Sequence, residues 1–74
     1  MNKVVLVTGG FDPLHSGHIA YINAAAQLGN QLHIGLNSDA WLTRKKGMPF
    51  MPFLERVAII QELKAVDSVF GFND

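Results

Sequence analysis

The sequence predicts an α/β fold, in which a three-stranded parallel sheet is built in the order β-α-β-α-β. Short runs rich in β-branched residues alternate with stretches whose apolar residues recur at helical spacing. Each predicted strand also ends in glycine or small polar residues, where parallel sheets bind their ligands. These observations indicate one half of a doubly wound sheet, with residues 1–74 forming a single domain.

The first half of the chain supplies two predicted strands and a helix. Lys3–Thr8 is a β-branched run that ends at a glycine pair, which is typical of a buried parallel strand. A glycine-rich loop leads to a helix over His18–Leu28, where apolar residues return to one face. Gln31–Leu36 is the second predicted strand.

The second half supplies a short helical turn, a loop, a helix and a strand. Asn37–Asp39 can cap a turn through Leu42. Arg44–Pro52 begins with three cationic residues and contains two prolines, so we expect a loop there. Phe53–Lys64 has apolar residues at helical spacing, and Ser68–Phe70 is the third predicted strand.

Composition excludes several classes of protein. Hydrophobic residues make up 49% of the chain and charged residues 16%, which excludes disorder. Six basic residues balance six acidic ones, so we expect neither a nucleic-acid partner nor a membrane surface. There is no cysteine for a disulfide or a thiolate zinc site. The apolar run Val4–Val7 is too short for a signal peptide or a membrane span, so we expect a cytoplasmic location by default.

A candidate anion site lies between the first strand and the first helix. The glycines of Thr8–Asp12 allow close approach of an anion, although a plain strand-to-helix turn has the same composition. His15 and His18 are three residues apart at the helix start, and Gly17 between them leaves room for a ligand. Two imidazoles beside free helix amides can bind phosphate oxygens and stabilise developing negative charge. A metal site, or two surface histidines near a cap, are the alternatives.

The segment Gly9–His18 reads GGFDPLHSGH and resembles the GxFDxxHxGH signature of cytidylyltransferase-like nucleotidyltransferases. This family includes glycerol-phosphate cytidylyltransferase and heptose-phosphate adenylyltransferase, and the chain resembles the latter branch most. The resemblance continues through four further segments: Gly35–Asp39, Arg44–Gly47, Pro52–Arg56 and Ala65–Val69. It covers only the N-terminal half of the family's domain and lacks the half that recognises the base.

The resemblance implies a Rossmann-like fold and a reaction. A nucleotidyl group passes from ATP or CTP to a phosphorylated small molecule, and pyrophosphate leaves with Mg²⁺. The implied catalytic residues are His15, His18 and Lys46. The implied nucleotide- and phosphate-binding residues are Thr8, Gly9, Gly10, Phe11, Asp12, Gly17, Asp39, Arg44, Lys45 and Arg56. No protein side chain is expected to ligate a metal.

Plainer roles stay open for several of these residues. Asp12 can cap a turn or the first helix, which we consider the stronger interpretation. Lys45 and Lys46 can belong to a solvated loop, and Arg56 can pair with a carboxylate on a helix surface. His33 lies in the middle of a strand and is expected on a sheet face rather than at a ligand.

Two further functions remain as alternatives, and assembly is a separate expectation. The chain can be a nucleotide-binding half-domain without independent turnover, or a structural or metal-binding half-domain that dimerises. Because the second half of the family's domain is absent, the strand Lys3–Thr8 would become a sheet edge with unpaired amides. We therefore expect a homo-oligomer, most simply a two-fold dimer.

Overall fold

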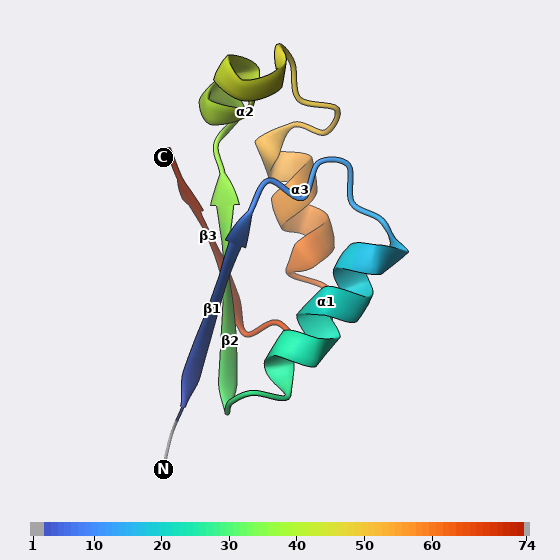
Figure 1. Cartoon of the computed structure of the whole chain (residues 1–74), viewed down its shortest axis with the longest axis vertical. Helices are drawn as coiled ribbons and strands as arrows, with labels where there is room; N and C mark the ends of the chain where they lie inside the picture. The colour runs from blue at the N-terminus through green and yellow to red at the C-terminus, as the bar shows by residue number, and fades with distance from the viewer. Residues whose placement is uncertain (1–2, 74) are drawn as a thin grey trace.

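The computed structural model describes residues 3–73 and shows three parallel strands and three helices (Figure 1). The sheet order is β1-β2-β3, and both strand pairs are parallel. This confirms the predicted α/β fold. In chain order the elements are β1 Val4–Gly9, α1 Ser16–Ala26, β2 Gln31–Asn37, α2 Asp39–Lys46, α3 Phe53–Ile60 and β3 Ser68–Phe72.

The strand register brings the carboxyl ends of all three strands to one end of the sheet. β1 pairs with β2 from Val4 opposite Gln31 to Gly9 opposite Leu36. β2 pairs with β3 from His33 opposite Ser68 onward. The loop after β1 and the start of α2 therefore lie at the same end of the sheet, where parallel sheets bind their ligands.

The core lies between the sheet and helices α1 and α3. Figure 1 shows α1 and α3 on the same side of the sheet. Ile34 and Leu36 of the central strand are fully buried, as are Ile22 of α1 and Ile60 at the end of α3. On the other face, Leu6 is 58% exposed. The core is thus one-sided within residues 3–73.

The helix boundaries differ from the sequence prediction in one place that matters for the site. α2 runs to Lys46, so the three basic residues expected in a loop form the last turn of a helix. Ser38 caps this helix by accepting a hydrogen bond from the amide of Trp41 at 3.1 Å. Cations at a helix C-terminus are stabilised by the helix dipole, and Gly47 at φ 95° ends the helix.

Candidate functional site

The start of α1 is capped by the two signature histidines. Nδ1 of His15, the N-cap, accepts the amide of Gly17 at 3.0 Å. Nδ1 of His18 in turn accepts the amide of His15 at 3.2 Å. The two rings stack with centroids 4.0 Å apart. Reciprocal bonds of this kind form a capping box, here made by imidazoles.

These hydrogen bonds assign the proton on each imidazole. Because Nδ1 accepts in both rings, the proton of each neutral ring is on Nε2. Burial, with a smaller contribution from His15, lowers the pKa of His18, which favours the neutral ring. The pair therefore offers two Nε2–H donors beside the loop after β1.

Glycine at position 17 makes room for a side chain of the protein itself. A Cβ there would lie 2.8 Å from Cε1 of His15, so only glycine lets the His15 ring fold back over the helix start. The expectation that this space also admits a ligand stays a prediction. The expected free amides are also partly used, because the amide of Gly17 donates to His15.

Asp12 ties the loop after β1 to the segment between α2 and α3. Its carboxylate accepts the amides of Phe50 at 2.8 Å and Met51 at 2.6 Å. It also forms an ion pair with Lys46 at 2.8 Å. Burial raises the pKa of Asp12, but the bonds from Lys46 and the two amides outweigh it, and the pKa is lowered. Asp12 is therefore structural, as expected, but it holds a distant loop rather than capping α1.

Lys46 lies beside the loop that carries the signature. Nζ donates to the carbonyl oxygen of Asp12 at 2.8 Å, in addition to the ion pair, and it lies 4.7 Å from the ring centroid of Phe50. Its side chain is 31% exposed, whereas that of Asp12 is 1% exposed. Lys46 is thus not part of a solvated loop. Its ammonium group is partly exposed and lies at the edge of the candidate site.

Arg56 is fully buried and joins four segments of the chain. Its guanidinium donates to the carbonyl oxygens of Gly10 at 3.0 Å and Asn37 at 2.6 Å. It also donates to the carbonyl oxygen of Met51 at 3.0 Å and to Oδ1 of Asp39 at 2.7 Å. The expected carboxylate pairing is present, but the expected helix-surface position is wrong. These bonds use four of the five N–H donors of the guanidinium, and the side chain is fully buried.

The remaining predicted residues divide into two groups. Phe11, at φ 50° and buried, sets its ring edge against His18 with centroids 5.0 Å apart. By contrast, Arg44 donates to the carbonyl oxygen of Asn73 at 3.1 Å, and Lys45 lies over the ring of Trp41. The structure thus gathers one set at the loop after β1: Gly9, Gly10, Phe11, Asp12, His15, Gly17, His18 and Lys46. Two further predicted residues lie outside this set. Thr8 is exposed, one residue before the end of β1, and Asp39 is bonded to Arg56.

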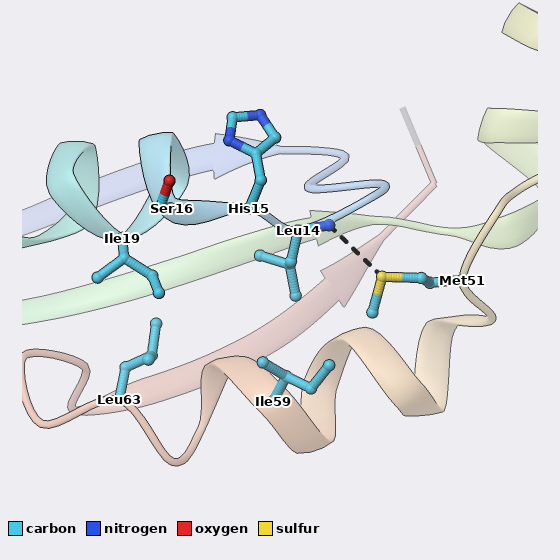
Figure 2. Close-up of a pocket in the computed structure, with 7 residues that line it drawn as sticks. All are labelled: Leu14, His15, Ser16, Ile19, Met51, Ile59 and Leu63. Atoms are coloured by element: carbon cyan, nitrogen blue, oxygen red, sulfur yellow. Dashed lines mark hydrogen bonds between the residues drawn. The ribbon is translucent and has the colours of Figure 1, made fainter.

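Sequence reasoning missed Phe50 and Met51. Both contact Asp12 through backbone amides, and the sulfur of Met51 accepts the amide of Leu14 at 3.4 Å (Figure 2). Backbone contacts leave no residue-type signal, so no pattern in the sequence could have identified them. His33 lies on a sheet strand as expected, bonded to Ser68 and Gln31.

An apolar cavity of about 260 Å³ lies next to this site, between α1 and α3. Figure 2 shows Leu14, Ile19, Ile59 and Leu63 turned toward it, whereas the ring of His15 points away. His18 is not among the residues that line the cavity. Within residues 3–73, no three His, Asp or Glu side chains gather in a group that could hold a metal ion. None of the helices in that range is long and apolar enough to cross a membrane.

Comparison with known proteins finds relatives of this chain. The chain is 45% identical over 74 residues to the bifunctional protein HldE of Erwinia tasmaniensis and 43% identical to that of Vibrio parahaemolyticus. It covers 16% of the length of each of these relatives. A solved lipopolysaccharide core biosynthesis protein from Thermoplasma volcanium superposes with a TM-score of 0.90 at 33% identity. The match covers 99% of this chain and 60% of that one.

A family model described as cytidylyltransferase-like matches residues 6–74. That range contains the loop after β1, both imidazoles, Lys46 and Arg56. The chain therefore belongs to the cytidylyltransferase-like family.

Proposed function

We propose that this chain forms the phosphate-binding part of a nucleotidyltransferase. The enzyme would pass a nucleotidyl group from ATP or CTP to a phosphorylated small molecule. An oxygen of the acceptor phosphate forms a bond to the α-phosphorus. The bond from that phosphorus to the bridging oxygen of the β-phosphate breaks, and pyrophosphate leaves. A cytoplasmic location remains part of this proposal.

The observation that carries the proposal is the pair of imidazoles with fixed Nε2–H donors. Each ring is held by a backbone bond to Nδ1, so neither has to reorganise when negative charge develops on a phosphate. Transfer of this kind depends on positioning and charge stabilisation rather than on a covalent intermediate. Lys46, held at the rim of the same loop, adds a cation for the triphosphate.

Mg²⁺ is expected to arrive with the triphosphate. The two carboxylates nearest the loop do not fit a protein-held metal, because Asp12 pairs with Lys46 and Asp39 pairs with Arg56. The ion would then be bound by phosphate oxygens, where it would neutralise their charge. The steps proposed for the protein's own residues do not depend on it.

Binding and turnover test the proposal separately. We would titrate the chain with ATP and with CTP by calorimetry, and measure pyrophosphate release with sugar phosphates and glycerol phosphate as acceptors. His15→Ala and His18→Ala should each weaken triphosphate binding or lower turnover by about 10²–10³. His33→Ala is the matched control, because that imidazole is bonded to Ser68 and Gln31 on the sheet. Equal behaviour of all three variants would contradict the assignment.

A nucleotide-binding unit without independent turnover is the second candidate. The observation in its favour is that the match covers 60% of the solved Thermoplasma volcanium protein. Triphosphate binding that depends on both histidines, without pyrophosphate release from any acceptor, would select this candidate over the first.

A further inference from the structure

Phe11 is held in an unusual backbone conformation beside the two imidazoles. Its φ of 50° lies in the left-handed region, which residues with a side chain rarely adopt. The backbone is fixed on both sides of it. The carbonyl oxygen of Gly10 accepts a bond from Arg56 at 3.0 Å. The carbonyl oxygen of Asp12 accepts one from Lys46 at 2.8 Å. Backbone strain persists where surrounding contacts fix it, and such residues cluster at functional sites, so we infer a role for the placement of this side chain.

The side chain of Phe11 contacts both the end of β1 and the imidazole of His18. It is 6% exposed and belongs to the hydrophobic core. A Cβ at Gly9 would lie 3.1 Å from Cε2 of Phe11, so glycine at that position leaves room for the ring. The ring meets the His18 imidazole in an edge arrangement, with centroids 5.0 Å apart and planes inclined by 61°. The core thus provides one fixed neighbour of His18.

His15 provides a second neighbour of His18, at the exposed start of α1. The two imidazoles stack, and Nδ1 of His18 accepts the amide of His15 at 3.2 Å. Because His15 is exposed and Phe11 is buried, Phe11 is the more rigid of the two neighbours. Without the ring of Phe11, the His18 imidazole would have space to turn, and the bond to its Nδ1 would weaken. Its Nε2–H would then no longer be a donor that is fixed before a phosphate binds.

We propose that Phe11 is a positioning residue of the phosphate site, whose buried ring fixes the His18 imidazole with Nε2 left to donate to a phosphate oxygen. The inference rests on the proposed function and adds one residue to it. The ring would act through His18, because the imidazole and not the ring donates to the phosphate. Aromatic edge contacts are weak, so loss of the ring should lower triphosphate affinity about 3–10-fold, much less than loss of His18 itself.

Phe11→Leu tests the contact without any nucleotide, because it removes the ring but keeps an apolar side chain in the core. Phe53→Leu is the matched control. Its ring also packs against a strand glycine, since a Cβ at Gly71 would lie 2.5 Å from Cζ of Phe53. Deuterium exchange of the His15 amide, followed by NMR, reports the bond to Nδ1 of His18. Phe11→Leu should accelerate this exchange, and Phe53→Leu should not. Unchanged exchange in Phe11→Leu would overturn the proposal.

Circular dichroism checks that the Phe11 variant folds. If Phe11→Leu does not fold, Phe11→Met takes its place in both experiments, because methionine is also apolar and unbranched and adapts to the shape of a core. The same two outcomes then apply to that variant.

A double-mutant cycle separates positioning from a general structural effect. NMR titration with ATP and with CTP would compare the parent, Phe11→Leu, His18→Ala and the double variant. Phe11→Leu should weaken binding about 3–10-fold in the parent, but less than about 2-fold in His18→Ala, where no imidazole is left to position. Equal losses in both backgrounds would indicate a structural role and overturn the proposal. A parent that binds neither triphosphate would contradict the proposed function, and the amide exchange would then decide whether Phe11 fixes His18.

Discussion

Replacing Arg56 by methionine tests whether the buried guanidinium holds the site together. Methionine keeps most of the volume of the side chain but removes every hydrogen-bond donor. Three carbonyl oxygens, those of Gly10, Asn37 and Met51, would each lose the bond that Arg56 donates to it. The carboxylate of Asp39 would lose its cation.

The magnitude follows from burial. Arg56 is 0% exposed, and removing one partner of a buried charged pair costs about 3–5 kcal/mol. The Asp39 side chain is 44% exposed, so water compensates part of that loss and the lower end, about 3 kcal/mol, is expected. A chain of 74 residues has a free energy of unfolding of only about 4–11 kcal/mol, so the variant should be near the limit of folding.

Urea unfolding followed by circular dichroism measures this effect. Arg56→Lys keeps the charge but cannot reproduce the fork of donors, so its loss should be smaller than that of Arg56→Met. Arg44→Met is the control, because the one hydrogen bond of Arg44 within residues 3–73 is to the exposed carbonyl of Asn73. The reasoning is refuted if Arg56→Met unfolds within about 0.5 kcal/mol of the parent, the range of ordinary surface substitutions. A loss of triphosphate affinity at unchanged stability would instead indicate that Arg56 contacts the substrate.

Four further predictions concern the loop after β1 and its partners. The pKa of His18 is lowered from 6.5, so the unfolded chain binds more protons than the folded chain below that pH. The urea concentration at the midpoint of unfolding should therefore be constant above pH 6.5 and fall below it. His18→Gln should reduce this dependence of the midpoint on pH. Asp12→Asn should cost about 1.5–3 kcal/mol in thermal or urea unfolding. Because the pKa of Asp12 is lowered, its ionised form stabilises the folded protein above pH 3.8, and this stabilisation is lost as the pH falls further. Acid unfolding of the parent and of Asp12→Asn would detect the difference. Lys46→Met should change unfolding by no more than about 1 kcal/mol, because the ion pair is partly exposed, while calorimetry shows weaker triphosphate binding. Gly17→Ala should displace the His15 ring, visible as a shift of its imidazole proton resonances, because the new Cβ would lie 2.8 Å from Cε1.

The fold was predictable because its signals are local. Apolar runs of strand length, helical spacing and glycine at strand ends are all properties of neighbouring residues, and the structure confirms the resulting order. The positions of the two histidines at the start of α1 were predictable for the same reason. Their mutual capping was not, because it depends on rotamers rather than on spacing.

Long-range contacts account for what the sequence did not show. Glu55 and Arg56 are adjacent charged residues at a helix start, yet only Arg56 is buried. Its burial depends on carbonyl groups of distant segments, which have no signature of their own. The extent of α2 was underestimated because an eight-residue helix is not stable alone, and its contacts, such as buried Leu42, come from the folded protein.

Arg56 and Asp12 join residues that are far apart along the chain, and this affects the order of folding. Gly10 and Arg56 are 46 residues apart, and Asp12 contacts amides 38 and 39 residues later. Closing loops of this length costs entropy before any bond is gained, so such contacts form late. During synthesis, the loop that carries the signature would leave the ribosome long before α3, which fixes its shape. That loop would then remain unfixed until residue 56 has emerged.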